Sequence, residues 1–232
     1  FKYIQSCRGI FVLIGEPGTG KSTALRRFSS NLNPGLYKSC YFTLSTVTVM
    51  DFYRGLLIAL GETPSHKKVV MFHQIQDAVC SYYYDQKITP VIMLDEIQLV
   101  SNSILEDIRL LFSFKMDSEN PFILILSGQP QIRNKLGLSV NAPLKQRVAI
   151  KHVMQGLKKE ELEHYLTSRL KISGLSENIF APSALEAIYS ISKGIPRLVN
   201  NLATASLMYA CSKKIQMIDE ETVYQGQRDF DM

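Results

Sequence analysis

The sequence lacks several features that define whole classes of protein. Its four cysteines, Cys7, Cys40, Cys80 and Cys211, lie far apart and form no C-x-x-C pair, so neither a zinc site nor a redox dithiol is indicated. No stretch approaches the roughly 18 consecutive apolar residues that a membrane-spanning helix needs. The N-terminus also lacks a basic segment followed by an apolar core and a cleavage site. We therefore expect a protein of the reducing cytoplasm, neither secreted nor membrane-embedded.

The size and charge of the chain are compatible with several domain organisations and several kinds of partner. It has 232 residues, 46% of them hydrophobic, which is enough for one large domain or for a main domain with a smaller one. A formal net charge of +5 is compatible with a polyanionic partner such as DNA, although the basic residues are spread along the chain. The chain opens at Phe1 rather than at a methionine, so we expect a native segment upstream of it.

A glycine-rich segment follows the apolar run at residues 10–14. It matches the phosphate-loop pattern G-x-x-x-x-G-K-[ST] at every fixed position and, with the threonine after it, consists of Gly15, Glu16, Pro17, Gly18, Thr19, Gly20, Lys21, Ser22 and Thr23. Glycines let the backbone curl with its NH groups facing a phosphate, Lys21 brings a cation to the β- and γ-phosphates, and Ser22 offers a hydroxyl to Mg²⁺. We therefore predict a nucleoside triphosphate site, rather than a glycine-rich turn that binds nothing.

Strand and helix signals alternate through the first part of the chain. Strands are predicted at residues 10–14, 39–44, 91–94, 122–126 and 147–150, and helices at 21–32, 50–60, 72–84 and 104–114. This alternation is typical of a parallel sheet covered by helices on both faces. Only helices are predicted after residue 157, at 158–172, 182–192, 196–212 and 219–225. We therefore predict an α/β nucleotide-binding domain with a five-stranded parallel sheet over residues 1–156 and a small helical domain over 157–232.

Two carboxylates end the apolar run at residues 91–94. A buried central strand delivers such acids to its carboxyl edge, next to the phosphate loop. Asp95 is predicted to hold Mg²⁺, directly or through water, and Glu96 to polarise the water that attacks the γ-phosphate. An Asp-Glu pair at a strand end is common by itself, but its position downstream of a complete phosphate loop favours the functional interpretation.

With these motifs in hand, the chain resembles the AAA+ ATPases along nearly its whole length. The resemblance rests on GEPGTGKS, VIMLDE, the polar segment LSGQP and the helical C-terminal region, which corresponds to the AAA+ lid. More narrowly, SGQPQIR, LKQR and GIPRLVNNL resemble the ExeA-type (GspA-like) subgroup, named for a secretion-pathway ATPase. Similar proteins accompany DDE transposases and look related to the transposition helpers TniB and TnsC. The resemblance implies a P-loop NTPase fold that hydrolyses ATP with Mg²⁺, with part of the adenine contacts coming from residues upstream.

The same resemblance implies roles for several polar residues. Gln129 corresponds to sensor 1, which reads the γ-phosphate, with Ser127 as the substitute; either side chain can instead simply cap the turn before the next proline. Arg197 corresponds to sensor 2 in the lid, against the alternative of a solvated helix arginine. Arg147 resembles the arginine finger that reaches a neighbouring subunit's nucleotide, with Arg133 as the competing candidate and a surface salt bridge as the alternative for both. A finger implies a homo-oligomer, closed into a ring or open as a helical filament.

Three functions remain open at this stage. The first is an oligomeric ATPase that binds duplex DNA and recruits or regulates a transposase. The second is an assembly ATPase of envelope secretion, although proteins of that kind usually continue into a membrane helix. The third is a nucleotide-gated binding switch, against which Glu96 argues because a switch needs no water-activating carboxylate. Lys67, Lys68 and Lys135 are weaker candidates for DNA phosphate contacts, and a solvated loop explains them equally well.

Overall fold

The computed structural model describes residues 2–44, 48–115, 118–175 and 179–230, and the chain divides into two compact units. The first unit comprises Phe1–Glu16 and Lys21–Met154, and the second comprises Pro17–Gly20 and Gln155–Met232. Each unit has its own hydrophobic core.

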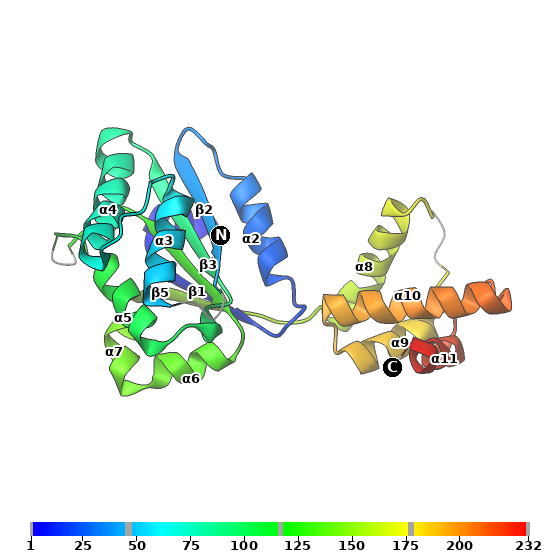
Figure 1. Ribbon diagram of the computed structural model, residues 1–232. Helices are drawn as coiled ribbons and strands as arrows, with labels where there is room; N and C mark the ends of the chain where they lie inside the picture. The colour runs from blue at the N-terminus through cyan, green and yellow to red at the C-terminus, as the bar shows by residue number, and fades with distance from the viewer. Residues whose placement is uncertain (1, 45–47, 116–117, 176–178, 231–232) are drawn as a thin grey trace. The chain divides into compact units, whose positions relative to one another are not determined.

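The first unit contains a sheet and the helices that pack on it (Figure 1). Its strands are β1 (Gly9–Gly15), β2 (Tyr37–Thr43), β3 (Thr89–Asp95), β4 (Ile123–Gly128) and β5 (Val148–Met154). Its helices are α1 (Lys2–Cys7), α2 (Lys21–Ser30), α3 (Val49–Leu60), α4 (Lys68–Cys80), α5 (Asn102–Leu111), α6 (Gln131–Gly137) and α7 (Ala142–Gln146). The strand order is β2-β3-β4-β1-β5, and every neighbouring pair is parallel. The predicted five-stranded parallel sheet is therefore confirmed.

The central strands are buried on both faces because their side chains alternate between two cores. Along β1, Ile10, Val12 and Ile14 belong to the core beneath α3, α4 and α5. Phe11 and Leu13 belong to the opposite core, where they meet Leu25 and Phe28 of α2. Figure 1 shows α2 on one side of the sheet and α3, α4 and α5 on the other. This is the physical reason why these strands are continuous apolar runs rather than alternating ones.

Local chemistry sets the ends of α3. Thr48 accepts a hydrogen bond from the backbone NH of Asp51, whose carboxylate in turn accepts from the Thr48 backbone, so the two form a capping box. The helix ends at Gly61, whose φ of 92° lies in the left-handed region that favours glycine.

The structure differs from the predicted elements in several places. Residues 72–84 are not one helix, because α4 ends at Cys80 and a π-helical turn over Ser81–Asp85 follows, with the Tyr82 hydroxyl donating to the carbonyl of Leu60. The short helices α1, α6 and α7 were not predicted, and β5 continues to Met154, four residues beyond the predicted strand at 147–150. Helices of one or two turns show little periodicity, and their form depends on tertiary packing.

The second unit is helical in its described part. It contains α8 (Lys159–Ile172), α9 (Pro182–Ser192), α10 (Pro196–Lys213) and α11 (Glu220–Phe230), with bounds close to the predicted ones. Both α9 and α10 begin with proline, which suits a first helical position because its missing NH has no partner there. The core of this unit includes Leu166, Ile188 and Val199.

Candidate active site

The end of β1, the start of α2 and the two carboxylates lie at one edge of the sheet. β1 ends at Gly15 and β3 at Asp95, and because the strands are parallel their carboxyl ends lie on the same edge. The loop after β1 has Gly18 at φ 84° and Gly20 at φ 96°, both in the left-handed region. These two positions therefore require glycine, as the phosphate-loop pattern has it.

Lys21 begins α2 and holds the loop at its base. Its side chain is buried, and its Nζ donates to the carbonyl oxygens of Gly15 and Glu16 at 2.8 and 3.1 Å. Burial removes the ammonium from water, which strengthens its attraction for an anion at the helix N-terminus. The site thus combines a cation with the backbone NH groups of a turn.

Asp95 is the centre of a hydrogen-bonded group. Its Oδ2 accepts from Ser22 Oγ at 2.7 Å and from the Tyr41 hydroxyl at 2.9 Å, and its Oδ1 accepts from the backbone NH of Glu96 at 3.0 Å. Asp95 itself is almost fully buried. A hydroxyl and a carboxylate at this separation form the hard-oxygen donor set that Mg²⁺ prefers, so Ser22 and Asp95 fit a magnesium ion.

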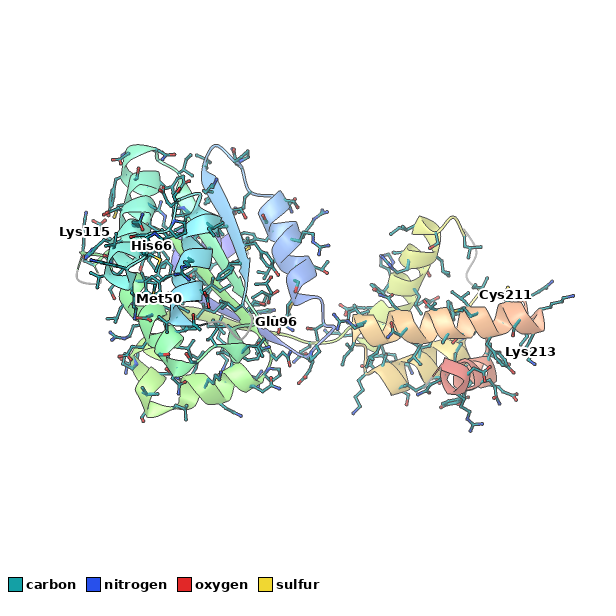
Figure 2. All side chains as sticks on the ribbon, viewed as in Figure 1. Met50, His66, Glu96, Lys115, Cys211 and Lys213 are labelled. Atoms are coloured by element: carbon teal, nitrogen blue, oxygen red, sulfur yellow. The ribbon has the colours of Figure 1, made fainter. Side chains whose placement is uncertain are left out.

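Glu96 has a backbone conformation that is uncommon for its residue type. It directly follows β3 (Figure 2) and has φ 58° and ψ 34°, in the left-handed region. Its Oε2 accepts from Gln98 Nε2 at 2.5 Å and from Gln129 Nε2 at 3.4 Å. Left-handed backbone at a non-glycine residue is strained and often marks a functional position.

The two candidates for sensor 1 have different surroundings. Gln129 is half-buried just after β4, and its side chain reaches the carboxylate of Glu96. Ser127 is fully buried within β4, and its hydroxyl has no hydrogen-bond partner among the described residues. Ser127 is thus closed off from solvent, whereas the Gln129 side chain lies beside Glu96. The sensor role itself stays a prediction.

Arg147 is engaged within its own chain. It follows α7, and its guanidinium donates to the carbonyls of Arg109 and Phe112 and to the hydroxyl of Ser113. These groups lie at the end of α5, where the last carbonyls lack intrahelical partners, so Arg147 caps that helix. The competing Arg133 is exposed on α6, and none of the hydrogen bonds or ion pairs of the described residues involves its side chain. The finger assignment stays a prediction for either residue.

The remaining basic candidates are distributed over both units. Arg197 is the second residue of α10, in the second unit. Lys68 pairs with Asp107 at 2.8 Å. Lys135 donates to two carbonyls of the turn after β3, whereas Lys67 is exposed before α4. Of the three lysines weighed for DNA contact, Lys67 is the one without an internal partner among the described residues.

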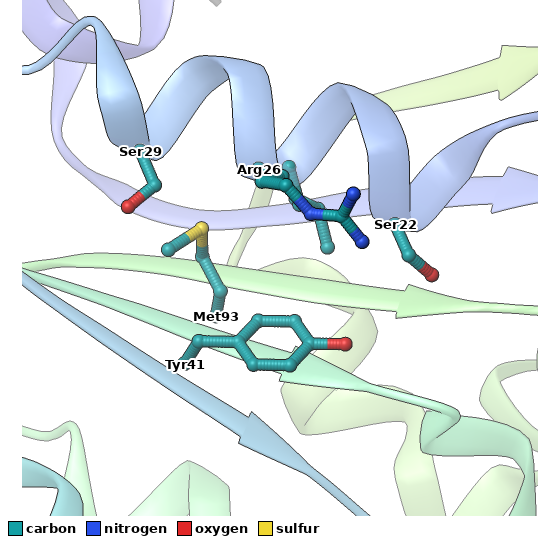
Figure 3. Close-up of a pocket in the computed structure, with 6 residues that line it drawn as sticks. Ser22, Arg26, Ser29, Tyr41 and Met93 are labelled. Carbon is teal, nitrogen blue, oxygen red and sulfur yellow. The ribbon is translucent and has the colours of Figure 1, made fainter.

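Two pockets flank the site within the first unit. One, of about 240 Å³, is lined by Ser22, Leu25, Arg26, Ser29, Tyr41 and Met93. Figure 3 shows Ser22, Arg26 and Ser29 along one face of α2, with Tyr41 on the facing strand. The other, of about 220 Å³, is mostly apolar and lies along β1 and β5; it is lined by Ile4, Phe11, Val12, Leu13, Ala24, Ile125, Ile150, His152 and Met154.

Comparison with known protein families shows which family the chain belongs to. The family model described as an AAA domain matches residues 4–136, which include the phosphate loop and both carboxylates. The chain belongs to the AAA domain family. The chain is also similar to the General secretion pathway protein A of Aeromonas hydrophila, with 28% identity over 213 residues, which supports a likeness to the ExeA/GspA type. That match covers 90% of this chain and 38% of the relative, so the chain spans about two fifths of that protein's length.

Solved structures support the same fold. Cdc6p from Pyrobaculum aerophilum matches with a TM-score of 0.69 and 16% identity, over 98% of this chain and 63% of that one. The Aeropyrum pernix ORC1 protein, solved in complex with DNA, matches with a TM-score of 0.65 and 15% identity, over 96% and 60%. The Thermotoga maritima RuvB Holliday junction branch migration motor matches with a TM-score of 0.56 and 18% identity, over 97% and 62%. At these identities the likeness concerns the fold alone.

Among the residues described for this AAA domain, no helix is both long and apolar enough to cross a bilayer.

Two residues of the AAA domain site were missed by sequence reasoning. Tyr41 lies near the carboxyl end of β2, two residues before Thr43, which is the register partner of Asp95, and its hydroxyl donates to the Asp95 carboxylate. Gln98 follows Glu96 by two residues and donates to its carboxylate. A polar residue at the end of a neighbouring parallel strand is a signal for the first, and the sequence Asp-Glu-Ile-Gln is one for the second. Both signals become specific only when the strand order is known.

Proposed function

We propose that this AAA domain binds ATP with Mg²⁺ and hydrolyses it. The observation that carries the proposal is the 2.7 Å hydrogen bond between Ser22 Oγ and Asp95 Oδ2, which brings the phosphate-loop hydroxyl and the strand-end carboxylate together beside Lys21. A glycine-rich turn without function would not require a buried carboxylate from another strand at this point. The family assignment supports the same proposal.

Each residue has a defined task in this proposal. The backbone NH groups of the loop bind the phosphates, and Lys21 neutralises charge on the β- and γ-phosphates. Ser22 and Asp95 hold the Mg²⁺, which supplies charge neutralisation at the phosphate oxygens. Glu96 orients the attacking water and accepts its proton through the oxygen that the two glutamines leave open. Gln129 senses the γ-phosphate.

The test compares phosphate release and ATP binding for wild type and Glu96→Gln. Removing a general base lowers turnover by about 10²-fold or more, while the amide keeps the size of the side chain and leaves binding intact. Equal rates would remove Glu96 from the mechanism. Bound ATP with negligible turnover in the wild type would instead favour the nucleotide-gated switch.

We further propose that the active form is a homo-oligomer, a ring or filament in which Arg147 or Arg133 contacts the nucleotide of the next subunit. Arg147 then has to exchange its bonds at the end of α5 for the phosphate, whereas Arg133 is already exposed. Arg197, in the helical domain that we place at residues 157–232, acts as sensor 2. Light scattering tests the assembly by comparing the molar mass of the protein in solution with and without ATP.

The apolar pocket along β1 and β5 is our candidate for the adenine base. It adjoins both ends of the phosphate loop in sequence, since Leu13 precedes it and Ala24 follows it. Purine pockets are largely apolar with few polar groups, here His152. Competition of ATP and GTP for a fluorescent nucleotide, in wild type and in Ala24→Leu, tests this placement.

For the cellular role, we propose an ATPase that assembles on duplex DNA and assists a transposase. The net charge of +5 and the fold shared with the DNA-bound ORC1 protein support the DNA part. Fluorescence anisotropy with duplex DNA, with and without an ATP analogue at two salt concentrations, tests it. Absence of nucleotide-dependent, salt-sensitive binding at low micromolar protein would contradict it.

A second role is favoured by a specific observation. The similarity to General secretion pathway protein A supports an assembly ATPase of a secretion system. The genomic neighbourhood distinguishes the two, because a transposase gene beside this one supports the first role and secretion genes support the second.

A further inference from the structure

The side chain of Gln98 joins the two polar groups that end β3 and β4. Its Nε2 donates to Glu96 Oε2 at 2.5 Å, and its Oε1 accepts from the backbone NH of Gln129 at 3.0 Å. A single amide thus connects the water-activating carboxylate to the backbone that carries the sensor 1 candidate. The Gln129 side chain donates to the same Glu96 oxygen at 3.4 Å, so three residues form a closed group.

The neighbouring backbone is shaped to admit this amide. Gly128, the last residue of β4, lies beneath it, and a Cβ atom built there would stand 2.7 Å from Gln98 Oε1. A side chain at position 128 would therefore displace the amide. The same Cβ would also meet Ile97 at 2.8 Å, so the first two residues of the 3₁₀ turn over Ile97–Leu99 pack on this glycine.

The turn that carries Gln98 is anchored from α6. Lys135 Nζ donates to the backbone carbonyls of Gln98 and Val100, which fixes the turn. Asn141, almost fully buried, donates to Asn102 Oδ1 and to the carbonyl of Lys135. The amide of Gln98 is therefore held by its own backbone as well as by its partners.

We propose that Gln98 is a positioning residue for hydrolysis, which holds one oxygen of Glu96 so that the other faces the attacking water. This inference rests on the proposed ATP hydrolysis. Glu96 has a strained backbone and a flexible side chain, and two amide donors on one oxygen select a single orientation of its carboxylate. A carboxylate that activates water accelerates the reaction mainly when it is placed to within a fraction of an ångström.

The experiment measures turnover, KM and ATP affinity for wild type, Gln98→Met and Gln98→Glu. Methionine keeps the length and packing of the side chain but cannot donate, and glutamate keeps the acceptor for Gln129 but loses the donor to Glu96. We expect kcat to fall by about tenfold or more in both variants, with KM and the ATP dissociation constant unchanged. The matched control is Gln131→Met, an exposed glutamine at the start of α6, which should behave as wild type.

A second comparison separates positioning from a structural role. If Gln98 acts through Glu96, Gln98→Met has no further effect on kcat in the Glu96→Gln background, whereas independent effects multiply. Three results would overturn the inference: an unchanged kcat in Gln98→Met, a loss of ATP affinity that parallels the loss of kcat, or effects of the two substitutions on kcat that multiply. Each of these leaves the proposed function standing as long as the wild-type protein hydrolyses ATP. Wild-type protein that binds ATP without hydrolysing it overturns the proposed function itself.

Discussion

Ser22 Oγ donates to Asp95 Oδ2 at 2.7 Å, although the two residues are 73 positions apart in the chain. The strand order explains how they meet. β4 lies between β1 and β3, so α2, which starts beyond the end of β1, brings Ser22 across the edge of β4 to the end of β3. Parallel strands with this order place loops from distant segments at one sheet edge.

Tyr41 supports the same carboxylate from the other side, and its removal should weaken Mg²⁺ binding. Partial burial, and then the neighbouring Asp95, raise the pKa of Tyr41 above its usual value, so its hydroxyl stays protonated and donates to Oδ2. Tyr41→Phe loses this hydrogen bond to a metal ligand, which typically costs about tenfold or more in metal affinity. The Mg²⁺ concentration for half-maximal phosphate release should rise accordingly. Tyr37→Phe, on the same strand but at its other end, is the control, and an equal Mg²⁺ requirement in Tyr41→Phe and wild type would contradict the prediction.

Lys21→Ala should abolish ATP binding. The substitution removes the ammonium that lies within the loop and its bonds to Gly15 and Glu16, so both the charge and the loop conformation are lost. Isothermal titration calorimetry with MgATP measures the loss. Lys67→Ala, which removes an exposed ammonium before α4, should bind as wild type. Because Lys21 is buried, a thermal melt of each variant is needed to show that it is folded, and a folded Lys21→Ala protein that retains affinity would contradict the assignment.

Arg147→Ala should destabilise the fold, whereas Arg133→Ala should not. The first leaves carbonyls at the end of α5 without their charged donor, which costs about 1–3 kcal/mol of unfolding free energy. The second changes an exposed side chain and should stay within about 0.5 kcal/mol. Urea unfolding measures both.

Mixing experiments then identify the finger. A finger acts on the neighbouring subunit, so a variant without it retains an intact active site of its own. If Arg133 is the finger, a mixture of Arg133→Ala and Glu96→Gln proteins should regain phosphate release, because one subunit supplies the glutamate and its neighbour the arginine. If Arg147 is the finger, the mixture of Arg147→Ala and Glu96→Gln proteins should do so instead. Rescue of neither, with both variants folded, would exclude both assignments.

The cysteines provide a test of the fold that is independent of nucleotide. Cys40 is buried in β2, and burial raises the pKa of its thiol to about 11, so at pH 8 it is both inaccessible and protonated. Cys7 and Cys211 are exposed, the latter on α10 (Figure 2). Maleimide labelling followed by mass spectrometry should modify Cys7 and Cys211 in native protein, and Cys40 only after unfolding or as the pH approaches its pKa. Rapid labelling of Cys40 at pH 8 would show that β2 is not packed as described.

Much of the fold was predictable from the sequence because its strongest signals are local. The run before Gly15 and the run before Asp95 are continuously apolar, which only a strand buried on both faces tolerates, and both are strands in the structure. The loop glycines were predictable for the same reason, since Gly18 and Gly20 adopt φ values that other residues rarely reach. Helices α6 and α7 were not, because their few turns carry no periodic pattern.

The sequence by itself determined the chemistry that is available: a glycine turn, one lysine, one hydroxyl and two carboxylates at strand ends. The tertiary structure alone decided which of these groups meet and which further side chains join them. Tyr41 contacts Asp95 because β2 pairs with β3, and Gln98 contacts Gln129 because β4 lies beside β3 and ends in Gly128. Strand order is set by the burial of whole faces against the helices, a property of the entire domain that no short segment encodes.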